Sequence, residues 1–181
     1  MQRRFLSVLV AALACAGIAP VLAQTSALKG HNSNAPVDVA ADRIEVQDRA
    51  DRAVFVGNVV VKQAEMTMTS ARLTVAYARD KKGNSTAGNV QIERLDASGG
   101  VTVTSPTERA VGQFGIYDLQ KKIVTLIGAV TLTRGDSKVN GARLTIDLDS
   151  GHAVMDGGGA PGTNSSGGRV TGTFTVPQKK S

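Results

Sequence analysis

Apolar residues recur at every second position along most of the chain, and this period is typical of β-strands that have one buried and one solvated face. Few stretches show the 3.6-residue period of an α-helix, and glycine is abundant, with 20 residues. The clearest alternating pairs are Val59 and Val61, Met66 and Met68, and Leu73 and Val75. The pattern therefore predicts an all-β protein.

Polar and glycine-containing segments divide the alternating stretches into about a dozen short strands. Consecutive short strands favour antiparallel pairing, so we expect an open-ended β-jelly-roll or a repeat-like antiparallel sandwich of many short strands. Open ends leave unpaired edge strands, to which another chain can add. The predicted strands are residues 36–39, 41–46, 53–61, 66–77, 90–95, 100–104, 109–117, 122–127, 129–133, 138–148, 152–156 and 169–176.

One segment of the chain is repeated. Residues 54–75 resemble residues 125–146 when the chain is shifted by 71 positions, and self-similarity of this kind is typical of repeat architectures. Gly57 and its counterpart Gly128 interrupt alternating strands, which predicts a bend or a bulge at each glycine. The identical pairs are Gly57 and Gly128, Val59 and Val130, Ala71 and Ala142, Arg72 and Arg143, Leu73 and Leu144, and Thr74 and Thr145.

The two ends of the chain differ from the predicted β-domain. Residues 1–23 have the basic start, the apolar run and the small final residues of a secretory signal peptide, so we expect cleavage between Ala23 and Gln24 and an exported protein. The predicted organisation is a signal peptide at 1–23, a flexible leader at 24–35, the β-domain at 36–156, a glycine-rich linker at 157–168, a last strand at 169–176 and a basic tail at 177–181.

Composition and charge disfavour several classes of function. The exported chain keeps no cysteine because Cys15 lies in the signal peptide, and loss of Arg3 and Arg4 lowers the net charge from +6 to +4. Dispersed Lys and Arg with few aromatic residues disfavour nucleic-acid binding. His31 and His152 have no neighbouring nucleophile, and no set of His, Cys and Asp has metal-ligand spacing. We therefore expect no enzymatic activity, no metal and no cofactor.

The apolar interior allows two interpretations. It is rich in Val, Met, Leu and Ile, a lining that suits a groove for acyl chains. An ordinary dry sandwich core accounts for the same residues, and composition alone favours that core. The aromatic residues of the exported chain are Phe55, Tyr77, Phe114, Tyr117 and Phe174.

Several motifs, taken in order, resemble one family. They are PVDVAADRI at 36–44, FVGNVVVKQ at 55–63, IGAV at 127–130 and VNGARLTI at 139–146. Over about residues 36–156 the chain resembles the LptA-type, OstA-like domain family of periplasmic lipopolysaccharide-transport bridge proteins. Its last strand and proline, residues 169–177, are also similar to that family.

The resemblance implies an open-ended β-jelly-roll with an aliphatic groove and no enzymatic activity. It implies that the groove shelters the lipid A acyl chains of lipopolysaccharide. The implied partners are further copies in a head-to-tail homo-oligomer, and inner-membrane and outer-membrane transport components that share the OstA-like fold. No nucleic acid is expected.

Strand alternation then predicts which positions line the groove, and Phe114 and Ile116 are the two most favoured because their strand has little other apolar bulk. Lys62, Arg72, Arg134 and Arg143 are candidates for contact with lipid phosphates, although a solvated face accounts for each of them. The predicted groove residues are Val37, Val39, Ile44, Val46, Val59, Val61, Met66, Met68, Leu73, Val75, Phe114, Ile116, Leu126 and Ile146. The predicted partner edges are Val37, Asp38, Val39 and Ala40 at one end and Val170, Phe174 and Val176 at the other.

Two other classes compete with a lipid carrier. The first is an exported structural or adhesive β-repeat protein with a dry core. The second, an exported carbohydrate-binding sandwich, is disfavoured because no aromatic platform is visible in the sequence. Lipid binding distinguishes the carrier from both.

Overall fold

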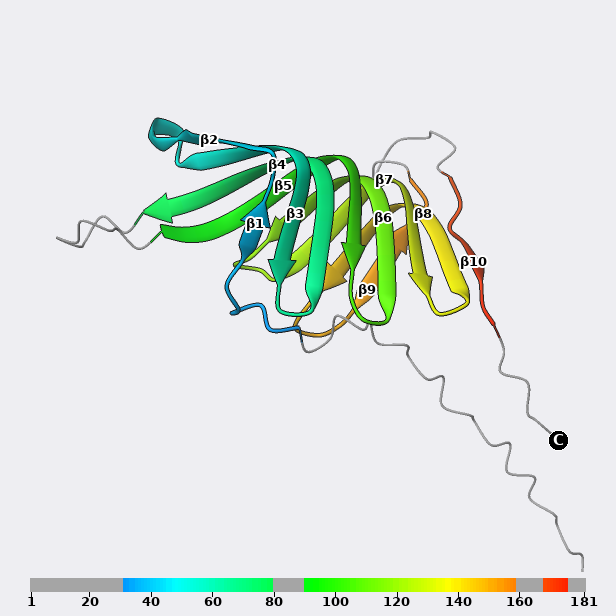
Figure 1. Ribbon diagram of the computed structural model, residues 1–181. Helices are drawn as coiled ribbons and strands as arrows, with labels where there is room; N and C mark the ends of the chain where they lie inside the picture. The colour runs from blue at the N-terminus through cyan, green and yellow to red at the C-terminus, as the bar shows by residue number, and fades with distance from the viewer. Residues whose placement is uncertain (1–30, 80–89, 159–167, 176–181) are drawn as a thin grey trace, which may run out of the picture.

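The computed structural model describes residues 31–79, 90–158 and 168–175 (Figure 1). These residues form ten strands and one short 3-10 helix at Asp48–Ala50, with no α-helix among them, so the all-β prediction is confirmed. None of the described helices is long and apolar enough to cross a membrane. The strands are β1 (Asp38–Ala40), β2 (Arg43–Gln47), β3 (Arg52–Gln63), β4 (Met66–Arg79), β5 (Val90–Thr104), β6 (Glu108–Asp118), β7 (Ile123–Arg134), β8 (Ser137–Asp147), β9 (Ala153–Asp156) and β10 (Thr171–Thr173).

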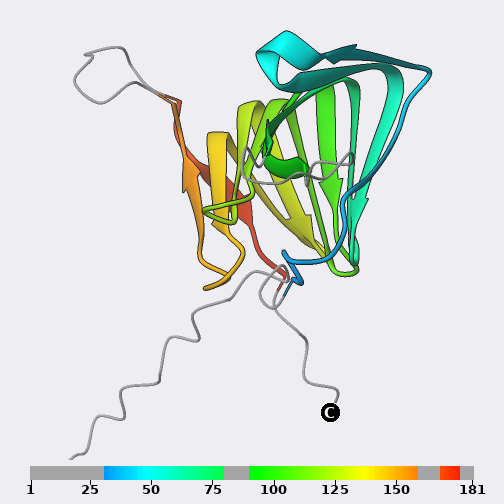
Figure 2. The same ribbon diagram turned by 90° about the vertical axis from the view of Figure 1, so that its left-hand side faces the viewer.

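All ten strands belong to one antiparallel sheet with the order β1-β3-β4-β5-β6-β7-β8-β10. The two ends of the sheet are forked. At one end, β2 pairs with the first half of β3 and β1 with its second half. At the other end, β10 pairs with the first half of β8 and β9 with its second half. The long strands bend over, so that their halves form two facing layers (Figure 2).

The bend follows a row of β-bulges. Register shifts occur between Val56 and Val59 in β3 and between Ile127 and Val130 in β7, and β4, β5 and β6 have shifts at corresponding places. Gly57 and Gly128 have φ angles of +83° and +88°, a region that glycine enters without steric cost. The predicted bulges at these two glycines are confirmed.

The bulges also explain where the predicted strand boundaries were wrong. The pairs 90–95 with 100–104, and 122–127 with 129–133, were expected to be separate strands, but each pair lies in one continuous strand, β5 or β7. A bulge adds an unpaired residue without ending the ladder, so the strand continues after it. The last strand, expected over 169–176, is limited to Thr171–Thr173 within the described residues.

The core fills the space between the two layers. The repeated segments supply matching core residues, since Val59 and Val130 are both buried, as are Leu73 and Leu144. Burying one such side chain contributes about 2 kcal/mol to the stability. Leu95 from β5 and Leu126 from β7 complete the centre of the cluster.

The predicted signal peptide at 1–23 and the basic tail at 177–181 lie outside the described residues. Of the leader, residues 31–35 are described, and they form a turn in which Ala35 N–H donates to the Asn32 carbonyl at 3.0 Å. Of the glycine-rich linker, the described ends Gly157 and Gly168 lie against each other. This contact sets the start of β10 beside β8.

Candidate functional site

The end of the sheet that carries β1 and β2 contains an apolar hollow of about 770 Å³, here called the N-terminal hollow. Its walls come from β1 to β5, so both layers contribute, and Asp48 is the one charged residue in the described part of its lining. The apolar lining residues are Val37, Val39, Ile44, Val46, Ala53, Phe55, Val75, Tyr77 and Ile92.

The opposite end of the sheet contains a second, smaller hollow of about 270 Å³, here called the C-terminal hollow. It has an ion pair in its wall, in which Arg134 Nε donates to Glu108 Oε1 at 2.6 Å. A buried carboxylate needs such a partner, because the unpaired charge would be costly to desolvate. The other lining residues are Leu132, Ser137, Val139, Leu144, Ala153, Met155 and Phe174.

The interior also contains a small cavity of about 10 Å³, here called the interior pocket. Met66 and Met68 form part of its wall, and their unbranched side chains adapt readily to a change in shape. Val37 is shared, because it lines both the interior pocket and the N-terminal hollow.

Gln63 is the most deeply buried polar side chain of the described residues, with 2% of its surface exposed. Its Oε1 accepts from the Tyr117 hydroxyl at 2.9 Å and lies 3.1 Å from His31 Nε2. Its Nε2 donates to the carbonyls of Ser33 and Ala35, at 2.9 and 3.0 Å. Burial raises the pKa of Tyr117, although its hydrogen bonds act in the opposite direction.

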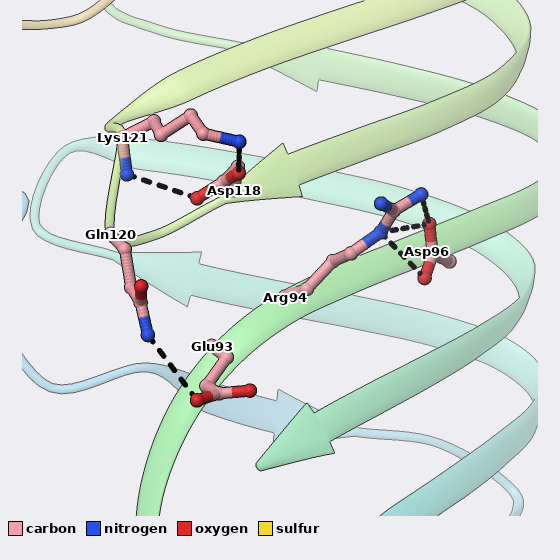
Figure 3. A network of polar contacts seen from close by, with 6 residues as sticks. All are labelled: Glu93, Arg94, Asp96, Asp118, Gln120 and Lys121. Carbon is pink, nitrogen blue, oxygen red and sulfur yellow. Dashed lines mark hydrogen bonds and ion pairs between the residues drawn. The ribbon is translucent and has the colours of Figure 1, made fainter. Parts of the chain in front are cut away.

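A polar network lies away from both hollows, where β5 meets the β6–β7 turn (Figure 3). Gln120 donates to Glu93, and Lys121 donates to Asp118 through both its ammonium and its backbone N–H. These hydrogen bonds from Lys121 lower the pKa of the Asp118 carboxyl. None of these residues lines a hollow, so the network is assigned to holding the turn.

The predicted groove residues fall into four places. Five of them line the N-terminal hollow: Val37, Val39, Ile44, Val46 and Val75. Val61, Met66 and Met68 line the interior pocket, together with Val37. Val59, Leu73, Leu126 and Ile146 lie in the packed core.

Phe114 and Ile116 occupy the fourth place, the outer face of β6. Phe114 is 50% exposed, whereas the alternate residues Gly115 and Tyr117 are buried. A Cβ atom at Gly115 would lie 2.9 Å from Val101 and 3.2 Å from Leu126, so β6 turns its small residue toward the core. The candidate groove defined by the hollows therefore does not include Phe114 or Ile116.

Several lining residues were missed from the sequence. Phe55, Tyr77 and Ile92 line the N-terminal hollow, and Leu132, Val139 and Met155 line the C-terminal hollow. Tyr77 continues the alternation of Leu73 and Val75. The 71-residue repeat would have found Leu132 from Val61, and Val139 from Met68.

The predicted partner edges lie at the two ends of the sheet. Among the described strands, β1, which contains Asp38, Val39 and Ala40, pairs only with β3, and β10 pairs only with β8. Val170 and Phe174 flank β10, and Phe174 is 62% exposed at the C-terminal hollow. Val176 lies outside the described residues.

The remaining candidates from the sequence are the four basic residues proposed to contact lipid phosphates, and His152. Lys62, Arg72 and Arg143 are exposed, whereas Arg134 pairs with Glu108. His152 lies exposed in a turn. No group of three or more His, Cys, Asp or Glu in the described ranges is placed to hold a metal ion.

These features define an all-β protein whose two sheet layers enclose an apolar interior that opens at both ends. Residues 38–152 match the family described as LptA/(LptD N-terminal domain) LPS transport protein. The chain belongs to this lipopolysaccharide-transport family.

Two further comparisons give one relative in sequence and one in fold. The chain is 32% identical over 157 residues to the uncharacterized protein R00383 of Rhizobium meliloti (strain 1021), covering 81% of this chain and 84% of that protein. Its fold is similar to the crystal structure of LptH, the LptA-homologous periplasmic component of the lipopolysaccharide transport device of Pseudomonas aeruginosa. The TM-score is 0.64 at 21% identity, over 81% of this chain and 99% of LptH. The predicted open β-jelly-roll is confirmed.

Proposed function

We propose that this protein is a non-enzymatic periplasmic carrier that shelters the lipid A acyl chains of lipopolysaccharide and bridges the inner and outer membranes by end-to-end assembly. The observation that carries the proposal is the pair of apolar hollows, one at each end of a single bent sheet. The family assignment supplies the cargo. Export would follow cleavage between Ala23 and Gln24.

The energetics of the cargo favour a sheltered path. Exposing an acyl chain to water costs about 0.8 kcal/mol for each methylene group, so a chain of about ten methylenes costs about 8 kcal/mol. Aliphatic walls lower this cost by contact alone. Transport of this kind needs no catalytic group in the protein.

The forked ends of the sheet supply a means of assembly. Short edge strands with free backbone groups are sites for β-augmentation by another chain. We infer that β1 and β2 of one copy meet β9 and β10 of the next, which places the N-terminal hollow of one copy against the C-terminal hollow of the other. Inner-membrane and outer-membrane components with the same fold would join the two ends of the row in the same way.

Site-specific photocrosslinking to lipopolysaccharide tests the cargo and the site together. A photocrosslinking residue at Phe55 is expected to give a lipid adduct, because Phe55 lines the N-terminal hollow. The matched control is Val56, the next residue of β3, which is 38% exposed on the other face. Met155 and Val154 form the equivalent pair at the C-terminal hollow.

Adducts at Phe55 and Met155 that excess unlabelled lipid suppresses, with none at Val56 or Val154, would support the carrier. Equal labelling at all four positions would indicate nonspecific adsorption. Complete absence of adducts in the folded protein would reject the carrier and favour the structural or adhesive β-repeat protein.

A further inference from the structure

The described part of the leader lies across the gap between the two sheet layers. Residues 31–37 run along the lower ends of the strands before β1 begins (Figure 1). Gln63, at the end of β3, belongs to the layer that contains β1, and Tyr117, near the end of β6, belongs to the other layer. Since β4 and β5 separate β3 from β6 in the sheet, the Gln63–Tyr117 hydrogen bond crosses the interior.

Gln63 also holds the leader in this position. Both hydrogen atoms of its amide are used on leader carbonyls, those of Ser33 and Ala35, and His31 contacts its oxygen. The same side chain therefore joins three parts of the protein: the β1 layer, the opposite layer and the leader. Removing this side chain would release the leader and would also remove the hydrogen bond between the two layers.

Val37 follows the leader by two residues and forms the partition between two cavities. It lines the N-terminal hollow on one side and the interior pocket on the other. Movement of Val37 away from Met66 and Met68 would join the pocket to the hollow. The joined space would extend the apolar surface from the end of the sheet toward its centre.

We propose that residues 31–37 form a strap over a latent chain-binding pocket, and that an aliphatic chain entering from the N-terminal hollow displaces the strap and occupies the space beside Met66 and Met68. The ligand class, an acyl lipid, rests on the proposed function. The strap itself rests on the Gln63 contacts and on the shared position of Val37.

The bonding of the strap is suited to release. Its hydrogen bonds to the body before β1 centre on one side chain, Gln63, and the ladder that follows has only the three residues of β1. The Ser33 hydroxyl is buried beside Tyr117, so displacing the strap would return it to water. Local opening is expected where buried contacts are few.

Hydrogen exchange measured by NMR tests the strap. The Ser33 and Ala35 amides close the leader turn by donating to the carbonyls of His31 and Asn32. In Gln63→Met, which keeps the side-chain length but removes the amide, both amides are expected to exchange about tenfold faster without any lipid. Gln91→Met, at an exposed glutamine of β5, is the matched control and should leave their exchange unchanged.

Lipopolysaccharide added to the native protein should also accelerate exchange at Ser33 and Ala35. A photocrosslinking residue at Met68 should form more lipid adduct in Gln63→Met than in the native background, by about fivefold, with no gain in Gln91→Met. Tyr117→Phe, which removes one hydroxyl and keeps the ring in the core, provides a second variant if Gln63→Met does not fold.

The two proposals fail differently. A lipid adduct at Phe55 together with unchanged or slower exchange at Ser33 and Ala35 would overturn the strap and leave the carrier intact. No adduct at Phe55 would reject the carrier and, with it, the ligand of the strap. Native-like exchange in both Gln63→Met and Tyr117→Phe would show that these contacts do not hold the leader.

Discussion

At the scale of single residues, Gln63 and Arg134 are polar side chains at the margins of a largely aliphatic interior. Gln63 ends β3 and Arg134 ends β7, and they occupy corresponding positions of the 71-residue repeat. Gln63 is satisfied by Tyr117 and the leader, and Arg134 by Glu108. A buried polar group left without a partner costs about 1–3 kcal/mol, so each residue ties its end of the sheet to a specific neighbour.

Because of Tyr117, the stability of the protein is expected to fall at alkaline pH. Because burial raises its pKa, the folded protein holds this proton more tightly than the unfolded chain, whose tyrosine has a pKa of about 10. The stability that this difference in pKa contributes is fully present below the unfolded pKa. It is lost as the pH rises through the raised pKa of Tyr117 in the folded protein. Ionisation would also place a phenolate beside Gln63 Oε1, which is an acceptor.

Denaturant unfolding between about pH 9 and 11 measures this effect. The free energy of unfolding is expected to fall less steeply with pH in Tyr117→Phe than in the native protein. Lys122 and Asp149, which act electrostatically on Tyr117, remain in both proteins. Parallel pH profiles would show that Tyr117 does not contribute.

At the scale of elements, the row of bulges converts a single sheet into two layers. Each bulge adds a residue that has no cross-strand partner and turns the strand, and the shifts in β3 to β7 are aligned across neighbouring strands. The glycine of the first bulge is also confined by its surroundings. A Cβ atom at Gly57 would meet the Asp42 carboxylate, which accepts a hydrogen bond from Asn58 at 2.9 Å.

Gly57→Ala is therefore expected to destabilise the protein by about 3 kcal/mol, from about 1–2 kcal/mol of left-handed backbone strain and the displacement of Asp42. Gly100→Ala is the matched control, because Gly100 has a φ of +80° but nothing within 4 Å of a Cβ atom. It should lose only the strain, about 1–2 kcal/mol. Urea unfolding measures both, and equal losses would rule out the contact with Asp42.

At the scale of the whole molecule, the two ends are different surfaces that are predicted to fit each other. A head-to-tail contact of this kind does not close on itself, so it generates rows of copies whose length rises with concentration. Thr173→Pro is expected to block the C-terminal edge, because proline removes a backbone donor and is poorly accommodated in a strand. Val39→Pro is expected to block the N-terminal edge for the same reason.

Sedimentation velocity tests this assembly. The native protein should show species that grow with concentration, and each variant alone should remain monomeric. An equimolar mixture of Val39→Pro and Thr173→Pro should form dimers and nothing larger, since one intact N-terminal edge and one intact C-terminal edge remain. Dimers of either variant alone would contradict a head-to-tail contact. Circular dichroism verifies that both variants are folded.

The sequence by itself determined the all-β class, the bulges at Gly57 and Gly128 and the family. Alternation, repetition and short motifs can all be seen in the order of residues, without knowledge of which strands pack together. Five predicted groove residues line the N-terminal hollow for the same reason. The sequence did not indicate which face of β6 is buried, since Phe114 and Ile116 are more apolar than Gly115.

Only the tertiary structure decided that face, because the close approach of Val101 and Leu126 leaves room for glycine and not for a larger side chain. It likewise decided the position of residues 31–35. Their polar composition indicated a flexible leader, whereas the carbonyls of Ser33 and Ala35 are bound by Gln63, about thirty positions along the chain. Contacts over such separations depend on how the sheet bends, and no local pattern in the leader records them.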